Sequence, residues 1–106
     1  MSANKQKAIR KALRYVKRGN LDEAIKAYFG ALSVDDRDYR VILRLGDLYW
    51  QKRDAAKALE FYREAAAKLS REGFFEHAIS VYRQILQIEG PSPESVLSPA
   101  GFIGRF

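Results

Sequence analysis

Residues 42–62 decide the fold, and they read ILRLGDLYWQKRDAAKALEFY. The first half places Gly46 and Tyr49 on one apolar stripe with helical spacing. After a polar break, the second half places Ala58 and Tyr62 one helical turn apart. Small residues such as Gly46 and Ala58 let two antiparallel helices approach each other closely. The stretch therefore predicts a tightly packed pair of helices.

The same arrangement occurs earlier in the chain. Ala24 and Tyr28 stand 34 residues before Ala58 and Tyr62, and the pattern of the preceding helix repeats at the same interval. A fixed period of roughly 20–50 residues is typical of stacked-repeat proteins. With this period and these residue types, the chain resembles the tetratricopeptide repeat family over residues 5–91.

The resemblance implies an all-α fold, a right-handed α-solenoid of antiparallel helical hairpins with about two and a half repeat units. We expect this domain to span residues 1–90, with five helices at about 4–18, 21–33, 39–52, 54–71 and 74–88. A Pro- and Ser-rich tail follows at residues 91–106, where all three prolines lie. We expect this tail to be either mobile or docked on its own chain or on a neighbouring one.

The last helix breaks the period. Ala78 and Tyr82 copy Ala58 and Tyr62, but 20 residues later rather than 34. We therefore expect the alanine-rich helix at 54–71 to serve twice, as second helix of one hairpin and first helix of the next. The expected buried stripe of the last helix is Ala78, Ile79, Tyr82, Ile85 and Leu86.

The composition leaves little for catalysis or metal binding. The chain has no cysteine and one histidine, His77, and it lacks a P-loop, a nucleophile elbow and a His–Glu metal motif. We expect no enzymatic activity, no cofactor and no metal site. No apolar run approaches the roughly 18–20 residues of a membrane span, and no apolar block starts the chain. We therefore expect a cytoplasmic protein.

In the tetratricopeptide repeat family, first helices line a concave groove that holds a peptide or helix of another protein. The resemblance thus implies a scaffold or adaptor, similar to small bacterial members of the family. The matching groove positions are Ile9, Arg10, Leu13, Val16, Lys17, Arg40, Leu43, Arg44, Asp47 and Trp50. An apolar floor under a basic rim suits an amphipathic helix or an apolar peptide with acidic flanks. Core packing remains the alternative role for Leu43 and Trp50.

A basic first helix offers a second interpretation. Seven Lys and Arg residues precede the first acidic residue, Asp22, and the formal net charge of the chain is +6. Such a helix could bind an acidic surface, either nucleic acid or an anionic membrane. The apolar spacing within the same helix argues against this interpretation, because it predicts packing on the next helix. We therefore expect neither nucleic acid nor membrane to be the partner.

Self-association is the third interpretation. The last helix ends the array without a polar capping helix, and exposed apolar ends of such arrays are normally covered. The candidates for self-association there are Val81, Ile85 and Ile88, which could face water if no further helix covers the last one. The tail could also take part, through Phe102, Ile103 and Phe106.

Overall fold

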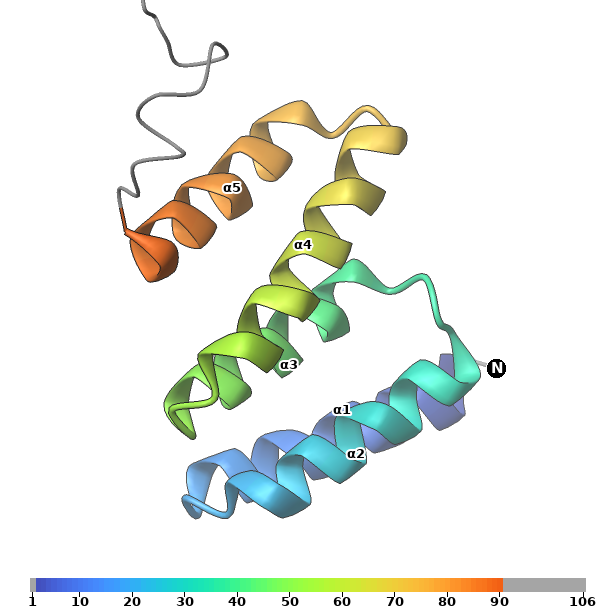
Figure 1. Ribbon diagram of the computed structural model, residues 1–106. Coiled ribbons are helices and arrows are strands. Elements are labelled where there is room, and N and C mark those ends of the chain that lie inside the picture. Colours follow the sequence, from blue (N-terminus) through green and yellow to red (C-terminus); the bar gives the residue numbers. More distant parts are fainter. Residues whose placement is uncertain (1, 91–106) are drawn as a thin grey trace, which may run out of the picture.

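The computed structural model describes residues 2–90, with side chains from Asn4 onward. The described residues form helices and turns only, which confirms the expected all-α fold (Figure 1). The tail at 91–106, with Phe102, Ile103 and Phe106, lies outside the described residues. The helices are α1 (Ser2–Lys17), α2 (Leu21–Val34), α3 (Tyr39–Gln51), α4 (Ala55–Arg71) and α5 (Phe75–Glu89).

Short polar turns fix where the helices begin and end. The side chains of Asn20, Asp38 and Asp54 accept backbone N–H groups from the first turns of α2, α3 and α4. Gly19 ends α1 with φ +75°, a left-handed conformation that glycine adopts without a steric penalty. Phe74 holds the corresponding position before α5 and makes no side-chain capping bond. The turns are tight, so each helix folds back along the previous one.

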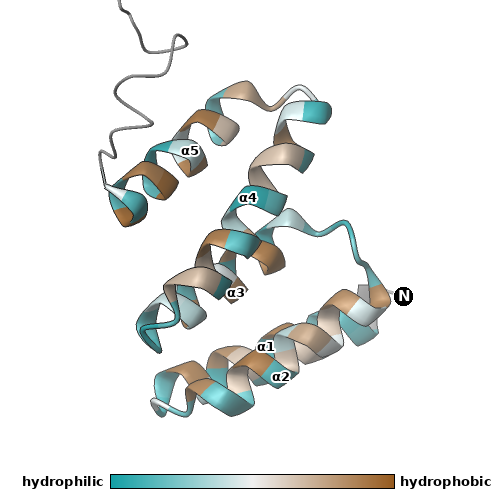
Figure 2. Ribbon diagram, viewed as in Figure 1, coloured by the Kyte–Doolittle hydropathy of each residue, from teal (hydrophilic) through white to brown (hydrophobic). Residues whose placement is uncertain are grey.

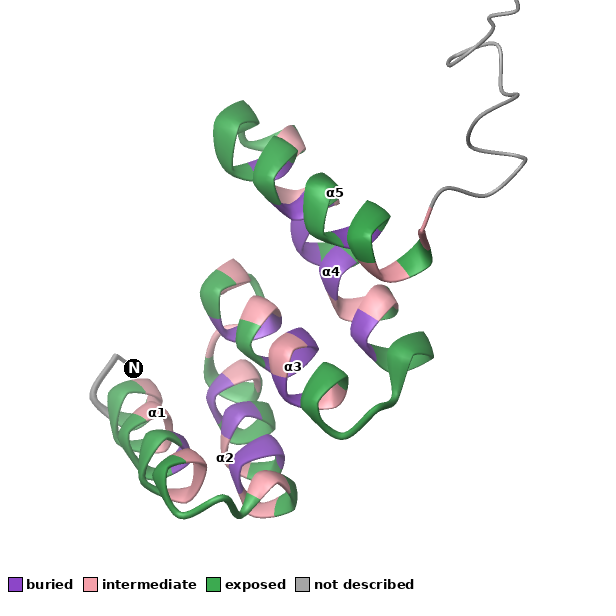
Figure 3. Cartoon of the chain, turned by 90° about the vertical axis from the view of Figure 1, so that its left-hand side faces the viewer, coloured by how far each residue is buried: buried purple, intermediate pink, exposed green. Residues whose placement is uncertain are grey.

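The helices form a staircase in which each one lies beside the next (Figures 1 and 3). α1 packs along α2, and α4 packs along both α3 and α5, while α2 and α3 make a smaller contact between the hairpins. This agrees with the expectation that the helix at 54–71 serves twice. Ala58, Ala65 and Ala66 of α4 are fully buried, because small side chains let neighbours approach α4 from two sides.

The ring of Tyr62 in α4 packs directly against Gly46 in α3. A methyl group added at Gly46 would stand 2.8 Å from a ring carbon of Tyr62, closer than carbon atoms pack. Tyr62 is 1% exposed and belongs to the core cluster between α4 and α5. Tyr49 packs against both this cluster and the one formed by α1, α2 and α3, so the two clusters are continuous.

The burial of α5 differs from the sequence prediction. Val81 and Ile85 were candidates for exposure to water, but both are buried against α4, and Ile88 packs at the edge of the same cluster. The burial of Ile85 agrees with its place in the expected buried stripe. Three members of the expected buried stripe are instead about half exposed, namely Ile79, Tyr82 and Leu86, at 51%, 46% and 53%.

The cause of this error is the number of neighbours. The Ala–Tyr motif predicted burial by comparison with α2 and α4, each of which packs against helices on two sides. Within the described residues, α5 packs extensively against α4 alone. Figure 3 shows buried residues of α5 only where it meets α4. Figure 2 shows that α5 nevertheless carries hydrophobic residues over much of its length.

Candidate functional site

A hollow of about 620 Å³ lies between α1, α3 and the loop that joins α2 to α3. Its apolar lining comes from Ile9 and Leu13 of α1, Tyr28 of α2 and Val41 of α3. Leu13 is 48% exposed, whereas Tyr28 and Val41 are buried beneath. Polar side chains complete the lining, and they are Lys5, Gln6, Asp35, Arg37, Asp38, Tyr39, Arg40, Arg44 and Glu72.

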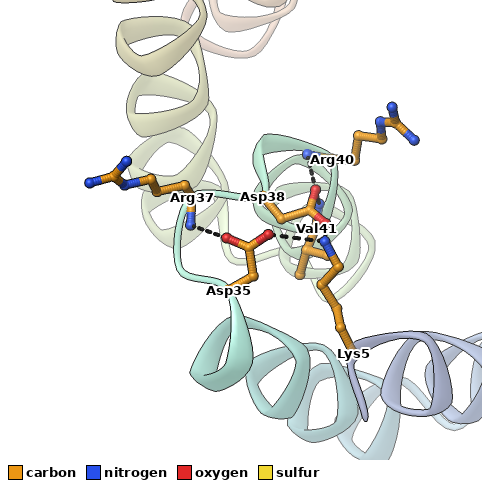
Figure 4. A network of polar contacts seen from close by, with 6 residues as sticks. All are labelled: Lys5, Asp35, Arg37, Asp38, Arg40 and Val41. Carbon is orange, nitrogen blue, oxygen red and sulfur yellow. Dashed lines mark hydrogen bonds and ion pairs between the residues drawn. The ribbon is translucent and has the colours of Figure 1, made fainter. Parts of the chain in front are cut away.

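An ion-pair cluster fixes one end of this hollow (Figure 4). The ammonium group of Lys5 lies 3.0 Å from a carboxylate oxygen of Asp35 and 3.0 Å from one of Asp38. The second carboxylate oxygen of Asp38 accepts the backbone N–H groups of Arg40 and Val41, at 3.1 and 3.4 Å. Lys5 therefore ties the start of α1 to the residue that caps α3.

The pKa values of this cluster follow from its contacts. The hydrogen bond to Asp35, and then the one to Asp38, raise the pKa of Lys5 above its ordinary value. The bond from Lys5, followed by the backbone N–H of Arg37, lowers the pKa of Asp35. Lys5 and Asp35 are thus charged at neutral pH, and Lys5 is paired with the carboxylates of both Asp35 and Asp38.

Sequence reasoning missed this cluster, although a signal for it exists. Asp35 and Asp38 fall between the helices expected at 21–33 and 39–52, and Lys5 was counted only among the seven cations before Asp22. In an antiparallel hairpin, however, the start of the first helix lies beside the end of the second. That register alone places Lys5 near the acidic loop that follows α2.

A second polar chain joins α3, α4 and α5. Arg44 donates to Asp47 at 2.9 Å, the Tyr62 hydroxyl donates to the other oxygen of Asp47, and Gln84 donates to the Tyr62 oxygen at 3.4 Å. Burial, and then the bond to Asp47, raise the pKa of Tyr62. Asp47 was expected among the groove residues, and its carboxylate accepts hydrogen bonds from Arg44 and Tyr62 of the same chain.

The expected groove residues fall into three sets. Ile9, Leu13, Arg40 and Arg44 line the hollow between α1 and α3. Leu43 and Asp47 line a smaller hollow of about 210 Å³ beside His77, Ser80 and Gln84 of α5, and Arg44 also lines that one. Neither hollow is lined by Arg10, Val16, Lys17 or Trp50. Val16 packs against the core, and Trp50 is 46% exposed.

The basic residues of α1 point away from its packed face. Ala8, Ala12 and Tyr15 pack in the cluster shared with α2, while a set of exposed cations covers the remaining surface, namely Lys7, Arg10, Lys11, Arg14 and Lys17. Among the described side chains, Lys5 is the member of α1 that forms ion pairs.

Residues 2–90 contain neither a metal-binding cluster nor a membrane-spanning helix. No group of three or more His, Asp or Glu side chains in this part of the chain is placed to hold a metal ion. None of the five helices described there is both long and apolar enough to cross a membrane.

Antiparallel hairpins that stack side by side define an α-helical repeat protein. The family model for the tetratricopeptide repeat matches residues 39–67, which comprise α3 and most of α4. A search of the curated proteins gave no match to this chain. Residues 39–67 thus carry a tetratricopeptide repeat, and members of that family generally serve as protein–protein interaction modules rather than as enzymes.

Proposed function

We propose that the chain is a non-catalytic adaptor that holds an amphipathic helix, or an apolar peptide with acidic flanks, in the hollow between α1 and α3. The domain that binds is residues 1–90. The observation that supports this most is the half-exposed side chain of Leu13 beside the apolar lining of a hollow of about 620 Å³. An apolar side chain of a partner that covers Leu13 would remove both groups from water, which favours binding.

The charges around the hollow favour acidic flanks on the partner. Lys5 is neutralised by Asp35 and Asp38, but Arg37 and Arg40 are exposed and take part in no ion pair among the described residues. Charge-assisted bonds from arginine to carboxylates fix the register of a bound peptide.

A displayed library of amphipathic peptides with leucine anchors and glutamate flanks provides the probe. Peptides selected on the wild-type chain are then titrated against variants by fluorescence anisotropy. Leu13→Ser is expected to weaken binding by about tenfold or more, since burying one leucine contributes about 1.5–3 kcal/mol. Leu86→Ser is the matched control, because Leu86 is equally exposed at 53% but lies on α5. Equal affinity of the wild type and Leu13→Ser would overturn the proposal.

The basic rim is tested separately. Arg40→Glu should weaken the selected peptides further, and less so at high salt, because it places like charges beside the acidic flanks. Arg71→Glu makes the same charge change on α4, outside the lining of the hollow, and should leave the affinity unchanged. Equal loss in the two variants would show a general charge effect instead of a rim.

The groove could also continue past Arg44 toward Leu43 and Trp50. If a bound peptide extends that far, Trp50→Ala and Leu43→Ala weaken longer selected peptides while short ones keep their affinity. Trp50 offers an aromatic surface that is half exposed, and such residues often contribute much of the binding energy. Equal affinities of the long peptides for these variants and the wild type would confine the site to the first hollow.

The exposed cations of α1 favour a second candidate, binding of an acidic surface. Lys7, Arg10, Lys11 and Arg14 are exposed and form no ion pair within the described residues. Duplex DNA and phosphatidylserine vesicles are suitable probes. Contact with phosphates would make the affinity fall steeply with salt, whereas a leucine-anchored peptide in the hollow would tolerate salt. No binding of either probe at low salt would exclude this candidate.

A further inference from the structure

The helix α5 carries a second apolar stripe that no described residue covers. We call it the outer stripe, and it consists of Phe75, Ile79, Tyr82 and Leu86, which are 62%, 51%, 46% and 53% exposed. The alternating spacing of four and three residues sets these side chains in one line along the helix. At 3.6 residues per turn the line lies roughly 110° around the helix from the face that packs on α4.

The other helices show what normally covers this stripe. Tyr28, Tyr62 and Tyr82 hold the same position in the motif of α2, α4 and α5, yet they are 3%, 1% and 46% exposed. Tyr28 packs in one cluster with residues of the next helix, α3, and Tyr62 is bonded by Gln84 of the next helix, α5. On α2 and α4, the surface that corresponds to the outer stripe is thus covered by the next helix of the chain. On α5, no described helix covers it.

The charges beside the outer stripe indicate which helix fits. Glu76 and Arg83 follow Phe75 and Tyr82 directly, so they lie on the same edge of the stripe and seven residues apart. Both are exposed, and neither forms an ion pair among the described residues. A helix that presents an arginine near Glu76 and a glutamate near Arg83 would match this edge.

We propose that the outer stripe binds the outer stripe of a second copy of this chain, with the two α5 helices antiparallel about a twofold axis. That arrangement sets Phe75 against Leu86 of the second copy and Ile79 against its Tyr82. It also brings Glu76 near Arg83 of the second copy, and the twofold axis repeats this pair. The exposed apolar stripe and the charges on its edge are therefore both compatible with self-pairing of α5.

The position of α5 is compatible with this dimer. α5 lies at one end of the array and the hairpin of α1 and α2 at the other (Figure 1). None of the four residues of the outer stripe lines the hollow between α1 and α3. The dimer and the peptide site can therefore be tested independently of each other.

Analytical ultracentrifugation of the full chain, from sub-micromolar to sub-millimolar concentration, tests the proposal. A reversible monomer–dimer equilibrium is expected. Leu86→Ser should weaken the dimer by at least tenfold, and Leu13→Ser, which removes an equally exposed leucine from the other end, should leave it unchanged. A chain that stays monomeric throughout, or a dimer that is insensitive to Leu86→Ser, would overturn the proposal.

A charge exchange tests the antiparallel arrangement. Glu76→Arg alone and Arg83→Glu alone should each weaken the dimer, because each places like charges at two contacts. The double variant should restore dimerisation to within about threefold of the wild type, since both pairs form again with their signs reversed. Failure of the double variant to recover, with each variant still helical by circular dichroism, would refute the arrangement.

The residues that follow α5 are a competing occupant. If Phe102 and Phe106 of the same chain covered the outer stripe, the wild type would be monomeric, and the Phe102→Ser/Phe106→Ser variant would begin to dimerise. That result would overturn the proposal for the intact protein. Under the proposal, the double variant and the wild type have the same dimerisation constant.

Discussion

The helices α4 and α5 carry the same motif and reach different burial. Ala58 and Ala78 are both buried, but Tyr62 is 1% exposed where Tyr82 is 46% exposed. α4 packs between two helices and α5 packs extensively on one within the described residues. The motif thus ensures one packed face, at the alanine, while the second face at the tyrosine depends on whether another helix is present.

The largest effect should separate the two tyrosines. Tyr62→Ala removes a buried ring and is expected to cost about 3–5 kcal/mol, a large part of the roughly 5–15 kcal/mol that stabilises a small domain. Tyr82→Ala removes a half-exposed ring and should cost less than about 1 kcal/mol in the monomer. Urea denaturation, at a dilution where sedimentation shows monomers, measures both. Equal costs would contradict the difference in packing.

A pair of glycines sharpens the same comparison. Gly46→Ala forces a methyl group against the Tyr62 ring, which lowers the stability of the fold by about 1–3 kcal/mol. Alanine has a higher helix propensity than glycine, and this offsets up to about 1 kcal/mol of the loss. We expect a net loss of about 1 kcal/mol. Gly30→Ala, inside α2, meets no atom within 4 Å and should therefore gain up to about 1 kcal/mol. Stabilisation by both substitutions, measured by thermal and urea unfolding, would rule out the close contact at Gly46.

The smallest effect concerns pH. Burial and the bond to Asp47 raise the pKa of Tyr62 in the folded chain, so folding favours the neutral phenol. Its contribution is fully present below pH 10, near the ordinary pKa of tyrosine, and is lost as the pH rises toward the folded value. Between neutral pH and pH values above about 10, the wild type should therefore lose more stability than Tyr62→Phe. The same loss in both proteins would contradict the account of this side chain.

Most of the fold follows from local patterns in the sequence. The interval between Tyr28 and Tyr62 predicts the stacked hairpins, and Asn20 and Asp54 predict where α2 and α4 begin. The sequence did not predict which residues of α5 are buried. A repeated motif shows which side chains can pack against another helix, but not whether that helix is present. For that reason Ile79, which was expected to be buried, is half exposed, and Val81, a candidate for exposure, is buried.

The candidate site was only partly predictable. Leu13 and Arg40, which the family register predicts as groove residues, both line the hollow between α1 and α3. The bond from the Tyr62 hydroxyl to Asp47 was not predicted, because Tyr62 lies on another helix and is buried. The pairing of Lys5 with Asp35 likewise joins residues 30 positions apart, which helical spacing within one element cannot reveal.

Hydroxyl-radical footprinting of Tyr28, Tyr62 and Tyr82 across a dilution series tests the account most directly. Tyr28 and Tyr62 should stay protected at every concentration, because helices of the same chain cover them. Tyr82 should react readily in the dilute monomer and become protected as the concentration rises and α5 pairs. The account would be contradicted if Tyr82 were as protected as Tyr62 in the monomer. It would also be contradicted if the reactivity of Tyr82 did not change with protein concentration.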